Sequence, residues 1–96
     1  MQKERGETVV ETRVFLTNKL GLHARSAAML TKLAAKFDSV VHLYGASKSA
    51  NAKSVLMVMS LGLSKGAEMT ITAHGPDEAA CLVALTELVA NNFYEE

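Results

Sequence analysis

The first regular pattern in the chain is an alternation of apolar and polar positions over residues 8–17. Glu11 and Arg13 fall on the polar side of this alternation. The positions that share the apolar side are Val10, Thr12, Val14 and Leu16. A period of two with β-branched residues predicts a strand that is buried on one face.

The period then changes to about 3.6 over residues 24–37, where Ala27, Leu30 and Phe37 recur at helical spacing with Leu33 or Ala34 between them. Lysines occupy the other side of this segment, which is therefore predicted to be an amphipathic helix.

The remaining segments alternate in the same way between the two periods. We expect strands over residues 39–44, with Val41 and Leu43 facing inward, over 48–52, and over 67–73, with Met69 and Ile71 facing inward. A short apolar helix is expected over 54–66. A last helix follows the Pro, Asp and Glu of "GPDEAACLVALTELVANNFYEE", with one buried stripe. The residues of that stripe are Leu82, Leu85 and Val89.

The expected order is therefore β-α-β-β-α-β-α, in which three helices must bury their apolar stripes on one face of a four-stranded sheet. This is a two-layer α+β domain. The polar stretch at residues 1–7 is expected to be a flexible tail, and residues 8–96 a single domain.

Composition narrows the possible functions. Ten basic and ten acidic residues cancel, which argues against a nucleic-acid binder. A single cysteine, Cys81, allows no internal disulfide and favours a reducing, cytoplasmic location. We find no signal-peptide pattern and no apolar stretch of membrane-spanning length. We expect no cofactor and no membrane insertion. A group-transfer or carrier protein and a pure binding module both remain open.

Candidate chemistry gathers at "GLHARSAA", residues 21–28, where His23 stands immediately before a predicted helix. A helix N-terminus offers free N–H groups and partial positive charge to an anion. Arg25 adds a planar set of donors suited to phosphate, and Gly21 lets the loop bend and approach closely. An imidazole is a competent nucleophile near neutral pH, so these features suit phosphoryl transfer through nitrogen. The alternative is that His23 only caps the helix or packs.

Two separated motifs, "LGLHARSAA" and "AKSVLMVMSLGLSKGAEMTITAHGPDEAACLVAL", closely resemble the HPr family of histidine phosphocarriers, which includes a nitrogen-related branch. The resemblance covers roughly residues 8–92. It implies an open-faced β-sandwich with an antiparallel sheet. It also implies a monomeric carrier that is not an independent catalyst, in which Nδ1 of His23 accepts a phosphoryl group from enzyme I and passes it to an enzyme IIA domain.

The same resemblance assigns Arg25 to the active site, with the backbone N–H groups of Ala24 and Arg25 on the phosphate. One departure is Ser26, which stands where the family usually has proline. Serine restores an N–H and adds a hydroxyl. The departure therefore concerns the rigidity of the helix start and leaves the nucleophile in place.

Ser54 begins the predicted middle helix, where a serine is an ordinary N-cap. The resemblance also places it at a position that a dedicated serine kinase phosphorylates in many relatives. A phosphate there would add negative charge at a helix N-terminus.

The helix that follows, "VLMVM" at 55–59, has more apolar residues than a core contact needs. We expect Val55, Leu56 and Met59 to be exposed as a partner-docking surface, with Lys32 at its rim. The alternative is that all five apolar residues are buried.

The other candidates are weaker. His42 and His74 have no carboxylate or cysteine at ligand spacing, so no metal site is expected, and Cys81 is expected near the core of the last helix. An alternative to the carrier is a regulatory protein whose binding depends on phosphorylation of His23 or Ser54, without sugar transport. A third reading is a domain of a larger phosphotransferase, against which the short tails argue. The retention of both His23 and Arg25 favours transfer.

Overall fold

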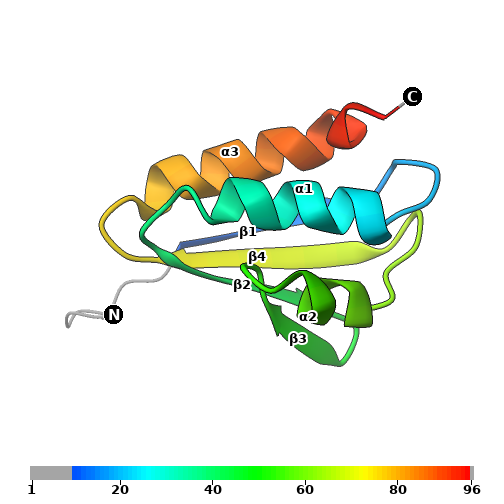
Figure 1. The fold of residues 1–96 in the computed structure, drawn as a ribbon, viewed down its shortest axis with the longest axis horizontal. Helices are drawn as coiled ribbons and strands as arrows, with labels where there is room; N and C mark the ends of the chain where they lie inside the picture. The colour runs from blue at the N-terminus through cyan, green and yellow to red at the C-terminus, as the bar shows by residue number, and fades with distance from the viewer. Residues whose placement is uncertain (1–9, 96) are drawn as a thin grey trace.

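The computed structural model describes residues 10–95, in which four strands form one antiparallel sheet with the order β1-β4-β2-β3 (Figure 1). The strands are β1 (Val10–Phe15), β2 (Val40–Gly45), β3 (Lys48–Asn51) and β4 (Glu68–His74). The strand predicted over residues 48–52 is confirmed as the short edge strand β3.

The register of the sheet places its apolar positions on one face. In the pairing of β1 with β4, Val14 lies opposite Met69, and in the pairing of β2 with β4, Leu43 lies opposite Ile71. These four side chains are buried, as a strand period of two requires when one face covers the core.

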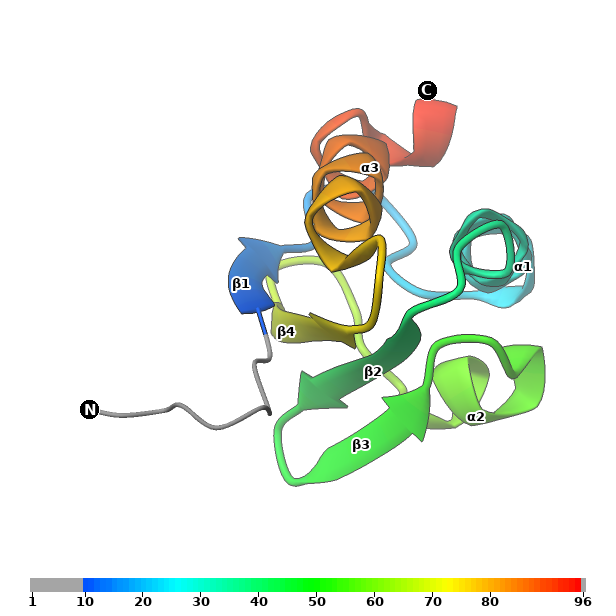
Figure 2. The same cartoon turned by 90° about the vertical axis from the view of Figure 1, so that its left-hand side faces the viewer.

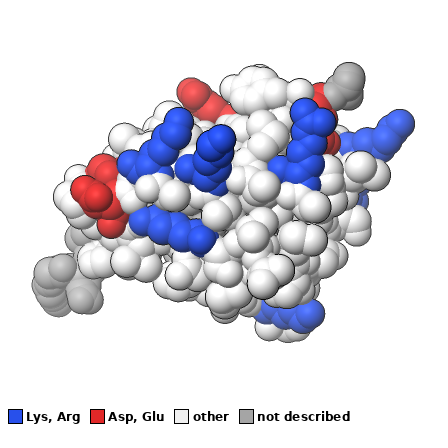
Figure 3. Space-filling model, viewed as in Figure 1, with Lys and Arg blue, Asp and Glu red and all other residues white. Residues whose placement is uncertain are grey.

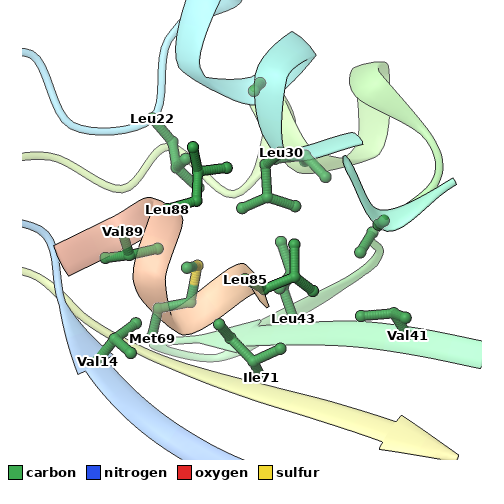
Figure 4. Close-up of a cluster of buried hydrophobic side chains, with 14 of the residues drawn as sticks. Val14, Leu22, Leu30, Val41, Leu43, Met69, Ile71, Leu85, Leu88 and Val89 are labelled. Atoms are coloured by element: carbon green, nitrogen blue, oxygen red, sulfur yellow. The ribbon is translucent and has the colours of Figure 1, made fainter. Parts of the chain in front are cut away.

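Three helices cover that face: α1 (Ala24–Ala34), α2 (Val55–Ser60) and α3 (Glu78–Ala90). The end-on view in Figure 2 shows all three on the same side of the sheet. The core lies between the two layers, where residues such as Leu30 of α1 and Leu85 of α3 meet the inward side chains of the sheet (Figure 4). The predicted two-layer α+β architecture is confirmed.

Both of the first two helices are shorter than predicted. α1 ends at Ala34, and the next turn tightens because the N–H groups of Lys36 and Phe37 donate to carbonyls three residues back. Phe37 still packs against the core from outside the helix. The helical spacing therefore predicted correctly that Phe37 contacts the core, but wrongly that it belongs to the helix.

The apolar run of residues 55–63 is divided between α2 and a loop. α2 ends at Ser60, and Gly62, with φ of +62°, turns the chain. Leu61 and Leu63 are buried from this loop. Their apolar character extended the prediction beyond the true end of the helix.

α3 begins where Asp77 ties it to the segment before β2. The Asp77 carboxylate accepts hydrogen bonds from the Ser39 hydroxyl at 2.6 Å and from the N–H groups of Asp38 and Ser39. These hydrogen bonds lower the pKa of Asp77 below its ordinary value. The Ser39 hydroxyl has the largest effect and the Asp38 N–H the next largest. This contact fixes the turn between β4 and α3.

The buried stripe of α3 is rotated slightly from the predicted one. Leu82 is only partly buried, while the buried residues of the helix are Cys81, Leu85, Leu88 and Val89. Cys81 lies in the core as expected, and burial, with a smaller effect of the Asp77 charge, raises the pKa of its thiol. The expected tail at residues 1–7, and the first two residues of the expected first strand, lie outside the described residues.

Candidate phosphoryl-acceptor site

His23 occupies the N-cap position of α1. Its backbone is extended (φ −130°, ψ −174°) and the helix begins at the next residue. Its side chain is 28% exposed, so the ring is accessible while being supported by the protein. The free N–H groups of the first turn lie beside it, as they do at any helix N-terminus. The structure therefore combines an accessible imidazole with an anion-favouring helix end.

Gly21 brings the loop before His23 against the loop that follows α2. Its φ is +65°, and a Cβ there would lie 2.6 Å from the carbonyl oxygen of Leu63. The N–H of Leu22 donates to that same oxygen at 2.9 Å. Both the backbone conformation and the close approach require glycine, and together they set the direction in which His23 enters the helix.

Ser26 ties the two sides of this loop together. Its side chain is fully buried, and its hydroxyl accepts the N–H of His23 at 3.0 Å and donates to the carbonyl of Gly21 at 2.8 Å. A hydroxyl at the third helical position thus satisfies the N-cap N–H, which is half of a capping box. Where proline would restrict the backbone, this chain holds the helix start with hydrogen bonds.

Glu95, near the end of the chain, reaches the ring of His23. The distance between Nε2 of His23 and Oε2 of Glu95 is 2.9 Å, and the Glu95 side chain is only 17% exposed. Nδ2 of Asn18 donates to the other carboxylate oxygen at 3.2 Å and to the carbonyl of Gly21 at 2.8 Å. Neither Asn18 nor Glu95 is among the residues predicted from the sequence. Glu95 lies 72 positions from His23, a separation that no periodicity or motif relates, and Asn18 belongs to no motif.

The pKa of Glu95 lies below its ordinary value. Burial by itself would raise the pKa, but the hydrogen bonds from Asn18 and His23 and the nearby charges of His23 and Arg25 outweigh it. The residue is therefore a carboxylate at neutral pH. Arg25 and Ala24 are both exposed in the first turn of α1, on the side of the helix start that a partner can reach.

The short helix α2 presents a second set of predicted site residues. Ser54 is its N-cap, and the Ser54 hydroxyl accepts the N–H of Met57 at 3.3 Å. Leu56 is 75% exposed and Met59 39% exposed, as expected. Val55 was expected to be exposed but is half-buried against the core, because only one turn separates it from the fully buried Val58.

Met57, at 45% exposed, takes the place that was assigned to Val55. We call Leu56, Met57 and Met59 the α2 apolar surface. In Figure 3, basic side chains gather over α1 while the surface over α2 is largely uncharged. The alternative in which all of residues 55–59 are buried is wrong.

The family of the chain follows from comparison with known proteins. The family model described as "PTS HPr component phosphorylation site" matches residues 10–91, which include His23 and both helix starts described above. The chain belongs to the HPr family.

Its relatives are phosphocarrier proteins. It is 41% identical to phosphocarrier protein HPr of Treponema pallidum over 88 residues, which cover 92% of this chain and 99% of the relative. It is 44% identical to HPr of Cupriavidus necator over 80 residues, 83% of this chain and 90% of the relative.

The fold has the same relatives. A crystal structure of HPr from Thermoanaerobacter tengcongensis matches with a TM-score of 0.87 at 40% identity, covering 91% of this chain and 98% of that one. A crystal structure of HPr from Bacillus anthracis gives 0.81 at 37% identity, covering 84% and 96%. The family likeness expected from "LGLHARSAA" is thus confirmed in sequence and in fold.

Other residues of this HPr-family chain lie away from His23. Lys32 is exposed and lines a groove between α1 and α3 together with Lys36, Glu87 and Tyr94, so its side chain borders α3 as well as α1. Its predicted place at the rim of the α2 apolar surface stays a prediction.

The two remaining histidines have local neighbours. The ring of His42 lies 6.3 Å from that of Tyr44, and Nδ1 of His74 lies 4.0 Å from a carboxylate oxygen of Glu78. Within residues 10–95, no three His, Cys, Asp or Glu side chains are grouped so that they could hold a metal ion. In the same part of the chain, none of the helices has the length and apolar character needed to cross a membrane.

Proposed function

We propose that this protein carries a phosphoryl group on Nδ1 of His23, accepts it from enzyme I with phosphoenolpyruvate as the original donor, and delivers it to an enzyme IIA domain. The observation that carries the proposal is the place of His23: an accessible imidazole at the N-cap of α1, with Arg25 in the first turn. The family match supports a carrier over a purely regulatory binding protein.

The transfer is a displacement at phosphorus. The Nδ1 lone pair forms the new N–P bond, the bond from phosphorus to the donor atom breaks, and the donor atom keeps that electron pair. The N–H groups of Ala24 and Arg25 and the guanidinium of Arg25 stabilise the phosphoryl oxygens. Delivery to the acceptor is the same displacement with His23 as the leaving group.

Partners dock, in this proposal, over the start of α1 and the α2 apolar surface. Flexible, polarisable methionine side chains suit a surface that must receive several partners in turn. Phosphorylation of Ser54 by a serine kinase would place charge at the edge of this surface and act as a regulator. We place the protein in the cytoplasm as a monomer that functions without a cofactor.

The test is incubation with phosphoenolpyruvate and enzyme I, followed by mass spectrometry. Wild-type protein should gain one acid-labile, base-stable phosphate, and His23→Ala should gain none. His42→Ala is the matched control, because it removes a partly exposed imidazole outside the site and should leave phosphorylation unchanged. Acid-labile phosphate on His23→Ala would contradict the proposal.

A further inference from the structure

We propose that Glu95 is a positioning residue for His23: its carboxylate accepts the Nε2–H and holds the ring with the lone pair on Nδ1. This inference rests on the proposed role of His23 as phosphoryl acceptor. It assigns a function in the transfer reaction to the segment that follows the last helix, which the sequence motifs do not reach.

The contact has the geometry of a charge-assisted hydrogen bond. Nε2 of His23 and Oε2 of Glu95 are 2.9 Å apart, and both side chains are partly withdrawn from solvent. A carboxylate has no proton to donate at neutral pH, so Nε2 must be the donor. In the neutral ring, Nδ1 is then the nitrogen with the free lone pair.

Glu95 is held from two directions. Asn18, which is buried, donates to its other oxygen and also to Gly21, so the carboxylate is linked to the loop that sets His23. The backbone before Glu95 is anchored as well, because Phe93, in the turn η1 (Asn92–Tyr94), is fully buried in the core.

That turn has an unusual backbone. Asn92, Phe93 and Tyr94 all have φ between +54° and +58°, a region that L-residues seldom occupy. Such a conformation persists only when its surroundings determine it, and here the buried Phe93 side chain and the hydrogen bond from the Thr17 hydroxyl to the Asn92 side chain do so. The turn follows α3 and places Glu95 beside His23.

The carboxylate has a part in each stage of the transfer. Before it, the hydrogen bond fixes the orientation and tautomer of the ring, as carboxylate partners do for other functional histidines. When Nδ1 forms the N–P bond, Nε2 keeps its proton, the ring becomes positively charged, and the carboxylate lies beside that charge. No proton has to leave the site, so the step balances without a further base.

The first test is the tautomer of His23, measured by long-range ¹H–¹⁵N NMR on the full-length, unphosphorylated protein at an alkaline pH where imidazoles are neutral. Wild type should show a single Nε2–H tautomer. Glu95→Gln retains an oxygen acceptor and should keep that tautomer, whereas Glu95→Ala should show a mixture. A mixture in wild type, or an unchanged single tautomer in Glu95→Ala, would overturn the inference.

The second test is the rate of phosphorylation by enzyme I. Glu95→Ala should lower kcat by about threefold to tenfold, the range for a charge-assisted contact at a partly exposed site, with KM and the melting temperature nearly unchanged. Glu95→Gln should fall between Glu95→Ala and wild type. Glu11→Ala removes an exposed carboxylate from β1 and is the matched control, with no expected effect.

The outcomes separate this inference from the proposed function. If wild type takes up no phosphate, the proposed function fails, and the tautomer measurement still decides whether Glu95 sets the ring. If wild type is phosphorylated and Glu95→Ala is equally fast or faster, Glu95 is dispensable or obstructs the site, and the positioning role is wrong.

Discussion

The starts of α1 and α2 are two helix N-termini built from the same local element, yet the protein supports them differently. His23 at the start of α1 is held by local and distant contacts. The Ser26 hydroxyl accepts the N–H of His23, the neighbouring Gly21 packs on the loop after α2, and the Glu95 carboxylate contacts the ring. Ser54 at the start of α2 has one cap hydrogen bond, to Met57.

The two helices also differ in length and in how many of their side chains they bury. α1 is an 11-residue helix that buries a full apolar stripe, so its first turn is a rigid support on which a nucleophile can be oriented. α2 has six residues and buries only Val58, which leaves its apolar side chains available to a partner. If the proposed function holds, the start of α1 orients the nucleophile and α2 recognises the partner.

The largest effect should come from placing a charge within α2. Val58 is fully buried, so Val58→Asp should unfold the domain or lower its stability by several kcal/mol. Leu56→Asp places the same charge on the α2 apolar surface, where it should leave the melting temperature nearly unchanged and weaken enzyme I binding by about 2 kcal/mol or more.

Calorimetric titration with enzyme I and thermal melts would distinguish the two substitutions. Collapse of Leu56→Asp in the melt would show that Leu56 supports the core and that partners dock elsewhere.

A smaller effect is expected at the start of α2. Ser54→Asp keeps an N-cap acceptor, so stability should hold or rise slightly, but its charge lies beside the surface proposed to receive enzyme I. Phosphorylation of His23 should slow by about tenfold, on the scale of 1–2 kcal/mol for an unpaired charge at an interface rim. Ser47→Asp adds the same charge in the exposed turn between β2 and β3 and is the matched control.

The measurement is the initial rate of His23 phosphorylation at matched concentrations. Equal rates for wild type and both variants would mean that Ser54 is only a cap in this protein.

The smallest effect on phosphorylation should appear at the start of α1, where Ser26→Ala removes a buried hydroxyl. The N–H of His23 loses its partner, while Gly21 keeps the hydrogen bond from Asn18. Stability should fall by about 1–2 kcal/mol, the usual cost of one unsatisfied buried group.

The melting temperature should therefore drop by a few degrees in Ser26→Ala. Phosphorylation should persist at a modestly lower rate, because the nucleophile and Arg25 remain. A variant with the stability of wild type would show that water replaces the hydroxyl and that Ser26 does not stiffen the helix start.

The sequence by itself determined the element order, the fold class and the inward faces of the strands, and it singled out His23 as the candidate nucleophile. Each of these is encoded locally: a period of two or 3.6 identifies the buried face, and a histidine before a helix is visible within "GLHARSAA". The exposure of Leu56 and Met59 was expected from the family resemblance and because residues 55–59 hold more apolar side chains than the core needs.

Only the tertiary structure decided what surrounds those local elements. Both α1 and α2 end earlier than the apolar pattern predicts. Phe37, Leu61 and Leu63 contact the core from turns, so their apolar character does not show that they are helical. Met57, and not the half-buried Val55, is exposed on the α2 apolar surface. Through a turn that holds one buried phenylalanine, the tertiary structure brought Glu95 to His23 and to Asn18. Contacts between residues more than 70 positions apart leave no periodic trace in the chain, because they depend on how the layers pack and not on any repeat along the backbone.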